Sequence, residues 1–500
     1  MYQENQEFYD VACYHGHEGY AAHVKSLETL DGWLAEAGVR KPFGNSEAGA
    51  RSYYTHPDMF RLQAAELVKK ITLTKSRSSE FYIWFMLHDY GDKYINADDS
   101  FGLVTVDNQP KPSFLAYNEL IRQLADTEPA EPVELDKRLR NYRFTRGGEE
   151  IFVCWPQGSA FSFALRSSAP IVRTDIFGNE TVIRPAGGIA FVDSGALPFY
   201  LRAPEGALGA VDAPLQVVGV PVFAPGEMGT VELELVNPYR EPFSYTLIAG
   251  GSERSGKLRS GEAVRFRVPA AIPTDAQFGA APFDCKLRLT GAGGAKLFDG
   301  SIALDSFVAL PVSEKAGAKV ILDRADQVRE MMFDPNSPRW SGPEDLSAEI
   351  RLGRRGATLV FDAVVTDDDH SAPGKDAYVW QNDCIQVGIG TLAGDHYEFT
   401  VSGDGKGGAT VWNHLRPRDN GNGAAWQVPA SVKRQGARTF YHFEIPAALV
   451  GLKGTAGEVF RIAYLVNDND KGRHMRFMEW NSGIQPSKNS NLFGRAKIVR

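Results

Sequence analysis

Histidine, glutamate and tryptophan residues stand at or near the ends of three apolar runs in the first quarter of the chain. His15 and His17 follow the first run, Glu47 follows the second, and Trp84 lies within the third, ahead of Asp89. Carboxylates act as nucleophiles or acid–base groups, and an indole can stack on the apolar face of a sugar. These residue types suit a sugar site. The alternative also stays open, because surface loops hold Glu and His by chance and a Trp in an apolar strand usually belongs to the core.

The elements that must position these residues alternate between strand and helix. Apolar runs predict three strands, and apolar residues at helical spacing predict three helices. In chain order these elements span residues 8–14, 21–37, 41–46, 57–75, 81–87 and 111–124. This order is typical of a parallel sheet, whose strands all end at one edge. A (β/α)₈ barrel needs eight such units, so either another chain completes the sheet or the sequence is an incomplete copy of a barrel.

Three stretches of this region resemble clan A retaining glycosidases, in the same order and spacing. Lys41–Ser52 is similar to the seventh strand of that clan, and Trp84–Gly91 is similar to the eighth. Phe101–Tyr117 looks like the segment that leads into the last helix. The resemblance covers residues 8–125 and implies the last three βα units of a (β/α)₈ barrel of β-xylosidase-like type.

The resemblance also implies roles for the residues at the strand ends. Glu47 matches the catalytic nucleophile, His15 or His17 would line the site, and Trp84 would form the floor of a sugar subsite. Retaining hydrolysis needs a second carboxyl group about 5–5.5 Å from the nucleophile.

That second group, the acid/base carboxyl, belongs to the fourth strand of the clan. The resemblance places the start of this chain near the sixth strand, so the acid/base residue is missing. Glu18 and Asp89 are carboxylates of this region, but neither matches the position in the clan. We therefore expect the chain to be inactive as a glycosidase on its own.

The rest of the chain changes to short strands joined by turns. Residues 126–132 read as a linker, and the strands that follow predict a small β-sandwich at 133–204. Residues 211–312 predict an immunoglobulin-like sandwich, and 313–500 hold a last β-rich unit. The predicted fold class is multidomain, with a partial (β/α)₈ barrel followed by all-β sandwich domains.

The last unit resembles family 9 carbohydrate-binding modules. The stretches that carry the resemblance are Trp340–Ile350, Leu359–His370, Tyr378–Val387, Tyr464–Gly472 and Glu479-Trp480. One departure is Gln386, which stands where the family pattern Trp-x-x-Asp-x-x-Glu ends in glutamate.

This resemblance implies a sugar-binding site. Trp380 and Trp480 match the positions that clamp a sugar ring, and Asn382, Asp383 and Asn481 are polar neighbours that could read hydroxyl groups. The alternative is that both Trp residues belong to the core.

Acidic residues in the same unit suggest a metal. Asp367, Asp368 and Asp369 follow one another, and Asp468 and Asp470 lie close together further on. Ca²⁺ takes several oxygen ligands, so this unit is a candidate calcium site. The alternative is a solvated strand end. We expect no cofactor to be required for the function itself.

Net charge, hydropathy and cysteine spacing exclude other classes of protein. The net charge is −8 and Lys and Arg form no cluster, which argues against nucleic acid as a partner. No apolar run is long enough to span a membrane, and the polar, acidic start of the chain is not a signal peptide. The four cysteines are far apart and are expected to be buried free thiols. By resemblance, the full-length form would be secreted or periplasmic.

Two functions follow from these observations. The first is hydrolysis of O-glycosidic bonds in a polysaccharide or oligosaccharide by a retaining mechanism, with sugar binding by the last unit. The second is a non-catalytic carbohydrate-binding protein with an inert barrel remnant. The sequence does not specify the sugar or the linkage.

Overall fold

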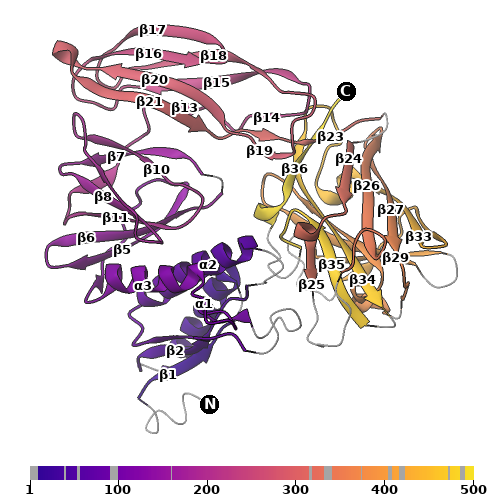
Figure 1. Ribbon diagram of the computed structural model, residues 1–500. Helices are drawn as coiled ribbons and strands as arrows, with labels where there is room; N and C mark the ends of the chain where they lie inside the picture. Colours follow the sequence, from indigo (N-terminus) through magenta and orange to yellow (C-terminus); the bar gives the residue numbers. More distant parts are fainter. Residues whose placement is uncertain are drawn as a thin grey trace.

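A computed structural model describes most of the chain and shows four units in sequence order (Figure 1). The described residues are 10–17, 19–38, 41–52, 57–90, 100–158, 160–314, 318–330, 340–372, 374–403, 408–415, 423–470, 473–484 and 490–500.

The first unit is a three-stranded parallel sheet with three helices. Its elements are β1 (Ala12–His15), α1 (Tyr20–Glu36), β2 (Phe43–Ala48), α2 (Pro57–Lys75), β3 (Tyr82–Trp84) and α3 (Pro112–Leu124). The sheet order is β1-β2-β3, and both pairings are parallel. The predicted alternation of strands and helices is confirmed. Phe8 and Tyr9, which begin the first predicted strand, lie outside the described residues.

One face of this sheet is covered by helices, and the other, called here the open face, carries exposed side chains among the described residues. Successive side chains of a strand point to opposite faces, so Ala12 is buried against the helices while Cys13 is exposed. Ile83 on β3 is also exposed. All four cysteines are free thiols. The prediction that they are buried is wrong for Cys13, because its position in β1 points it to the open face, and is confirmed for Cys154, Cys285 and Cys384.

The second unit is a small β-sandwich. Its strands are β4 (Glu128–Pro129), β5 (Leu139–Arg146), β6 (Glu149–Pro156), β7 (Ser162–Ser167), β8 (Ile171–Asp175), β9 (Glu180–Ile183), β10 (Ile189–Asp193), β11 (Phe199–Pro204) and β12 (Leu208–Ala210). They form a six-stranded sheet, β4-β5-β6-β11-β8-β9, and a three-stranded sheet, β10-β7-β12.

The helices of the first unit pack on the six-stranded sheet of the second. Leu67 of α2 and Leu120 of α3 share one core with Trp155 of β6 and Tyr200 of β11. The hydroxyl groups of Tyr20 on α1 and Tyr142 on β5 lie 3.1 Å apart. Because apolar surface is buried across the boundary, the first two units stabilise each other.

The third unit is a sandwich built on two antiparallel sheets, β13-β15-β18 and β17-β16-β20-β21, with a short sheet β14-β22-β19. Its strands are β13 (Leu215–Val217), β14 (Val222–Phe223), β15 (Met228–Val236), β16 (Phe243–Ala249), β17 (Ser252–Leu258), β18 (Ala263–Ala271), β19 (Gly279–Ala280), β20 (Phe283–Thr290), β21 (Lys296–Leu304) and β22 (Phe307–Val308). Val231, Leu233 and Leu235 alternate inward along β15, as expected for a half-buried strand.

The C-terminal unit, called here the C-terminal sandwich, packs two sheets over one large core. Its strands are β23 (Leu310–Val312), β24 (Ala318–Leu322), β25 (Val328–Glu330), β26 (Leu346–Arg355), β27 (Thr358–Asp367), β28 (Cys384–Gly390), β29 (His396–Gly403), β30 (Ala409–Leu415), β31 (Ala424–Ala425), β32 (Ala430–Gln435), β33 (Arg438–Pro446), β34 (Val459–Asp470), β35 (Arg473–Trp480) and β36 (Gly494–Ile498).

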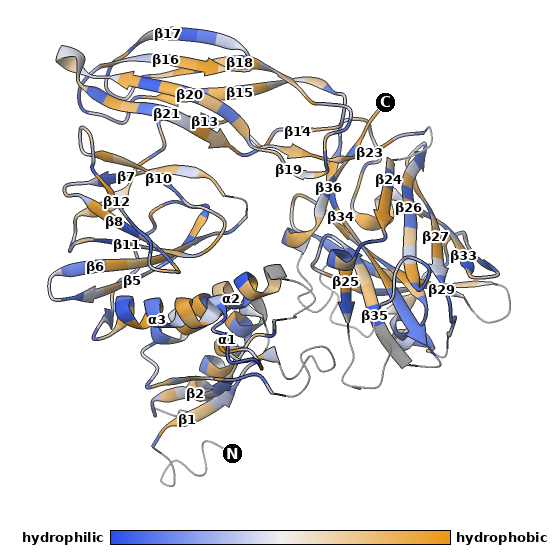
Figure 2. Cartoon of the chain, in the orientation of Figure 1, coloured by the Kyte–Doolittle hydropathy of each residue, from blue (hydrophilic) through white to orange (hydrophobic). Residues whose placement is uncertain are grey.

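The larger sheet of the C-terminal sandwich contains β23-β36-β34-β28-β29-β30-β31 together with β35 and β25, and the smaller one is β24-β26-β27-β33-β32. A short 3₁₀ helix, η5 (Asp376–Gln381), precedes β28. Figure 2 shows hydrophobic and hydrophilic segments alternating along these strands, the pattern of sheets with one buried face.

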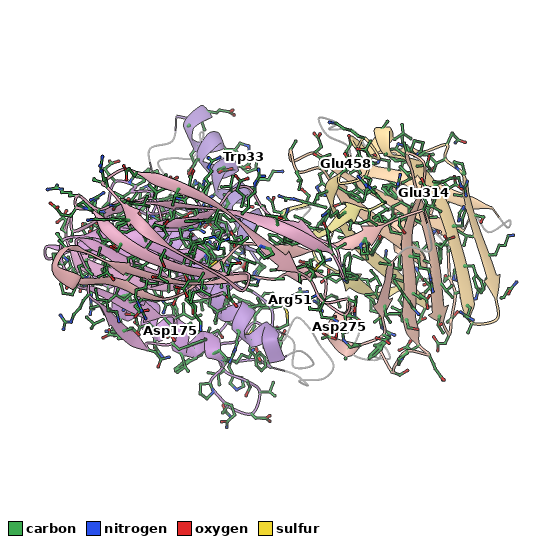
Figure 3. The ribbon with its side chains drawn as sticks, turned by 90° about the horizontal axis from the view of Figure 1, so that it is seen from above. Trp33, Arg51, Asp175, Asp275, Glu314 and Glu458 are labelled. Carbon is green, nitrogen blue, oxygen red and sulfur yellow. The ribbon has the colours of Figure 1, made fainter. Side chains whose placement is uncertain are left out.

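The third unit connects the N-terminal units to the C-terminal sandwich, as the view from above shows (Figure 3). Lys497 of β36 donates hydrogen bonds to Glu227 in the third unit, with Nζ–Oε distances of 2.6 and 2.8 Å. The guanidinium of Arg495 lies 3.8 Å from the ring centre of Phe307. Among the described helices, none is long and apolar enough to cross a membrane.

Candidate functional site

The ends of β1 and β2 bring together three of the predicted site residues. His17 Nε2 lies 2.9 Å from Glu47 Oε1, and His15 Nδ1 lies 3.8 Å from Glu47 Oε2. The side chain of Glu47 is 36% exposed, so a ligand can reach its carboxylate. Phe85 and Phe101 meet the His17 ring edge-on, with ring centres 5.4 and 5.1 Å away. An accessible carboxylate that faces an imidazole is suited to nucleophilic or acid–base chemistry. Glu18 lies outside the described residues.

Asp89 is a structural residue rather than an accessible acid. It is completely buried, and its Oδ2 lies 2.5 Å from Nζ of Lys111, which is buried too. Its Oδ1 accepts a hydrogen bond from the backbone N–H of Gly102. Burial lowers the pKa of Lys111, and the neighbouring Asp89 carboxylate opposes that shift.

Trp84 lies in the core rather than in the floor of a sugar subsite. It is 7% exposed and packs in the core shared with the second unit. Its indole N–H donates a hydrogen bond to the carbonyl oxygen of Phe101, 3.2 Å away. The expected subsite role does not fit this position, because the alternation of β3 turns Trp84 toward the helices.

The outer face of the larger sheet in the C-terminal sandwich carries a row of polar side chains, called here the polar row. Asn467 Nδ2 donates to Gln386 Oε1 and Gln386 Nε2 donates to Thr400 Oγ1, both at 3.3 Å. Thr400 Oγ1 lies 2.8 Å from His414 Nε2. The polar row therefore crosses β34, β28, β29 and β30, and the residues Asn467, Gln386 and Thr400 are buried within it. Gln386, the departure from the family pattern, stands in its middle.

Trp380 lies in η5, close to the polar row. It is partly buried, and its carbonyl oxygen accepts a contact from Cys384 Sγ. Two residues further on, Asn382 Nδ2 donates a hydrogen bond to Ser402 Oγ, 2.9 Å away, on the outer face of β29. This anchors the end of η5 to the face that carries Gln386.

Trp480 faces the other side of the same sheet. Its ring stacks on Tyr464, a core residue, with ring centres 5.7 Å apart, and meets Phe278 of the third unit edge-on. Because Trp480 pairs with Tyr464 across β34 and β35, both side chains point inward. The structure therefore does not bring Trp480 to the face that carries Gln386, and the predicted clamp with Trp380 is not formed there.

Asn481 is half-buried and Asp383 is buried, and neither belongs to the polar row. Asn481 has a positive φ of 59°, and the missing side chain of Gly494 leaves room for its amide. Asp383 is 3% exposed and accepts a hydrogen bond from the backbone N–H of Asn469 at 2.6 Å. Asp383 belongs instead to a group of buried carboxylates.

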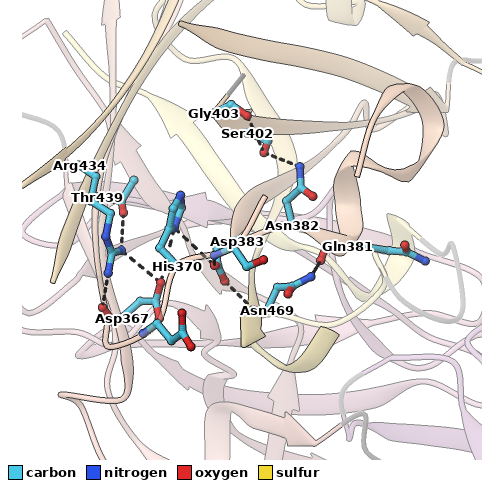
Figure 4. A network of polar contacts seen from close by, with 12 residues as sticks. Asp367, His370, Gln381, Asn382, Asp383, Ser402, Gly403, Arg434, Thr439 and Asn469 are labelled. Carbon is cyan, nitrogen blue, oxygen red and sulfur yellow. Dashed lines mark hydrogen bonds and ion pairs between the residues drawn. The ribbon is translucent and has the colours of Figure 1, made fainter. Parts of the chain in front are cut away.

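This group, called here the carboxylate cluster, forms where β27 and β34 end and β28 begins. Figure 4 shows Asp367, His370 and Asp383 next to one another in it. One set of possible metal ligands is Asp367, His370 and Asp383, and another is Asp367, Asp468 and Asp470. His370 Nδ1 lies 3.4 Å from Asp383 Oδ2 and 3.6 Å from Asp367 Oδ2. Asp368 and Asp369, the other members of the predicted run, follow Asp367 in the chain, and the N–H of Asp369 donates to Asp367 Oδ1.

Two arginines balance part of this charge. Arg434 Nη1 lies 3.3 Å from Asp367 Oδ2. Arg476 Nη1 lies 2.9 Å from Asp345 Oδ1 and 3.1 Å from Asp468 Oδ2.

Three acids of the carboxylate cluster lie where burial disfavours the charged form of the carboxylate. Burial raises the pKa of Asp383 to about 9, with a further contribution from Asp367. Burial likewise raises the pKa of Asp468 to about 8, against the effect of Arg476, and that of Asp470 to about 6. Oδ1 of Asp468 and Oδ1 of Asp470 accept no hydrogen bond from the described residues, whereas Oδ2 of Asp468 is paired with Arg476. Carboxylate oxygens of this kind are hard ligands that fit a calcium ion.

The last unit is a β-sandwich of two sheets packed over one core. Residues 328–500 match the family described as "Carbohydrate family 9 binding domain-like". The predicted resemblance of this unit to family 9 modules is confirmed. No curated protein matches the chain.

Solved structures give partial matches. A family 9 carbohydrate binding module from Caldicellulosiruptor kristjanssonii in complex with glucose is 16% identical, with a TM-score of 0.25, over 38% of this chain and 96% of that one. A family 39 glycoside hydrolase from Bacteroides cellulosilyticus WH2 is 22% identical, with a TM-score of 0.28, over 32% of this chain. The match spans 33% of that hydrolase. A GH30 endoxylanase from Clostridium papyrosolvens C71 is 12% identical, with a TM-score of 0.29, over 39% of this chain and 49% of that one.

Several residues of these sites were not among the predicted ones. Thr400, His414 and Asn467 gather on one face only because four strands pair in the observed register. His370 follows the Asp367–Asp369 run directly, so a search for imidazole next to acidic runs would have found it.

Proposed function

We propose that the C-terminal sandwich binds a neutral oligosaccharide or polysaccharide at the polar row, next to Trp380. The observation that carries this proposal is the polar row itself, in a unit that matches a carbohydrate-binding family. Amide, hydroxyl and imidazole groups both donate and accept hydrogen bonds, as sugar hydroxyls do. An indole next to such a row offers a flat surface for the C–H face of a pyranose.

The polar row favours an uncharged sugar. Its members carry amides, a hydroxyl and an imidazole, and include no Lys or Arg that would pair with a uronic acid. An acidic sugar would leave its carboxylate without a charged partner, which is costly in a buried site.

Affinity electrophoresis of the full chain tests this proposal. Gels that contain a soluble glucan, xylan or galactan should retard the protein, and Gln386→Leu should abolish the retardation. Gln216→Leu, in the third unit, is the matched control and should behave like the wild type. Equal retardation of the Gln386→Leu and wild-type proteins would contradict the proposed site.

The carboxylate cluster would hold a calcium ion that supports this fold. Asp367 comes from the smaller sheet, whereas Asp468 and Asp470 come from the larger one. A cation between them would join the two sheets and offset the charge that burial disfavours. The ion would be structural, since its ligands would come from both sheets and the polar row lies on the outer face of the larger one.

A second proposal concerns the first unit, in which Glu47 would be the nucleophile of a retaining O-glycosidase. The observation that favours it is the contact of Glu47 with His17 at the carboxyl ends of two parallel strands. The unit would then represent the last three βα units of a (β/α)₈ barrel. A polysaccharide substrate lies outside the cell, so a protein with this activity would be secreted or periplasmic.

This second proposal can be tested without an acid/base residue. In a dinitrophenyl 2-deoxy-2-fluoroglycoside, the carboxylate of Glu47 attacks the anomeric carbon, and the bond to the dinitrophenolate oxygen breaks. Dinitrophenolate leaves with the electron pair and needs no proton. Mass spectrometry of the full chain should show one added fluoroglycosyl group on Glu47, and none in Glu47→Gln. An unlabelled wild type across gluco-, galacto- and xylo-configured reagents would contradict the proposal.

A further inference from the structure

The ends of β1 and β2 are joined by a side chain that neither proposal uses. Lys70 lies in α2 and is completely buried. Its Nζ donates a hydrogen bond to the carbonyl oxygen of Gly16, 2.8 Å away, and another to that of Gly49, 2.9 Å away. One ammonium group therefore holds the turn after β1 and the turn after β2.

These two carbonyls flank the residues that meet at the site. Gly16 immediately precedes His17, and Gly49 follows Glu47 by two positions. The backbone N–H of Gly16 also donates to the carbonyl oxygen of Glu47 at 2.9 Å. A shift of either turn would change the distance of 2.9 Å between His17 Nε2 and Glu47 Oε1.

Filling a buried space with an ammonium group costs more free energy than filling it with an apolar side chain. Removing a charge from water costs several kcal/mol even when it is hydrogen-bonded, and an apolar side chain of similar length is commonly as good or better for stability. What an apolar side chain lacks is a donor that fixes two carbonyls at once. We infer that Lys70 is a positioning residue, which sets the relative placement of His17 and Glu47 by binding the carbonyls of Gly16 and Gly49.

This inference rests on the proposed role of Glu47 for its chemical consequence, but not for its geometry. Lys70→Met keeps the apolar stem and removes the donor. Lys111→Met is the matched control, because Lys111 is a second buried lysine of the same unit and binds Asp89 and Ser52 instead. Both variants lose a buried ammonium, so a general loss of stability affects both.

The first measurement is the rate of labelling by the dinitrophenyl 2-deoxy-2-fluoroglycoside, in the full chain. Lys70→Met should slow labelling of Glu47 by about tenfold to hundredfold, the effect of a displacement of about 1 Å at a reacting centre. Lys111→Met should stay within about threefold of the wild type. Equal slowing in both variants would overturn the inference.

The second measurement needs no labelling and separates the two proposals. Amide hydrogen exchange at Gly16 should be about tenfold faster in Lys70→Met than in the wild type, whereas Lys111→Met should leave it unchanged. If the wild type is not labelled but Gly16 responds in this way, the role of Glu47 fails and that of Lys70 stands. If Gly16 exchanges equally in all three proteins, Lys70 is not a positioning residue.

A milder pair of variants keeps the test decisive if Lys70→Met does not fold. Lys70→Arg retains donors for both carbonyls but moves them, so it should still raise exchange at Gly16 above that of Lys111→Arg. Identical exchange at Gly16 in the two arginine variants would overturn the inference.

Discussion

His17 and Glu47 are thirty positions apart in the chain, yet His17 Nε2 lies 2.9 Å from Glu47 Oε1. The contact exists because β1 and β2 run parallel and side by side, so that both strands end at the same edge. His15 reaches the same carboxylate from further away, at 3.8 Å, and is more exposed. The two histidines therefore differ in how strongly they can orient Glu47.

This difference leads to a prediction about labelling of Glu47. His17→Ala should slow labelling by about tenfold or more, because the carboxylate loses its close hydrogen-bond partner. His15→Ala should change the rate by no more than about threefold, as expected for an exposed and longer contact. The measurement is the pseudo-first-order rate by intact mass. A larger effect of His15→Ala than of His17→Ala would contradict the prediction that His17 orients Glu47 more strongly.

A substitution of Trp84 tests whether this residue belongs to the core or to a sugar site. Trp84→Ala should lower the free energy of unfolding by about 3–5 kcal/mol, since it removes a large buried side chain and one of the hydrogen-bond donors to the Phe101 carbonyl oxygen. Trp33, 62% exposed on α1, is the matched control, and Trp33→Ala should change stability by no more than about 0.5 kcal/mol. Urea unfolding of the full chain measures both, and similar values would place Trp84 outside the core.

The carboxylate cluster predicts how stability depends on pH. In the unfolded chain Asp383 and Asp468 have ordinary carboxyl pKa values near 3.8, whereas in the fold they titrate at about 9 and about 8. The folded state therefore binds more protons between these limits, and the free energy of unfolding falls as pH rises. Without divalent cations, the C-terminal sandwich should melt at a lower temperature at pH 8 than at pH 5.

Calcium should reverse this trend, because it replaces protons as the partner of the carboxylates. At about one hundred times its dissociation constant it adds about 2.7 kcal/mol. Calorimetry of the full chain, with chelator or with CaCl₂, measures the effect at both pH values. Asp470→Asn should weaken the calcium response, whereas Asp362→Asn, an exposed acid on the outer face of the smaller sheet, should not. A calcium effect that is equal in both variants would contradict the assignment.

Local patterns in the sequence were enough to predict the strands and helices of the first unit and the β-rich character of the rest. They also placed His15, His17 and Glu47 together, because parallel strands end at one edge. It was harder to predict to which face of its sheet an individual side chain points. An apolar run such as 81–87 gives no period from which to tell that Trp84 points to the helices. The sequence around Trp480 also did not show which way this side chain points; its inward direction follows from the pairing of Trp480 with Tyr464.

Long-range pairing accounts for most of what the sequence did not reveal. The polar row is assembled from four strands, and each of its residues alone looks like an ordinary polar position on a sheet. The core shared by α2, α3 and β6 joins two units that composition separates at residues 126–132. Neither arrangement leaves a periodic signal within one segment, so only the register and packing of the folded chain make them visible.

The central claim is that the C-terminal sandwich binds sugar beside Trp380, and titration calorimetry of the full chain tests it most directly. Glucose-, xylose- and galactose-based oligosaccharides serve as titrants. We predict saturable binding of at least one series and a loss of about 1 kcal/mol or more in Trp380→Ala, by analogy with aromatic stacking. Trp33→Ala should bind like the wild type. A folded Trp380→Ala protein with unchanged affinity, or no heat from any series, would contradict the account.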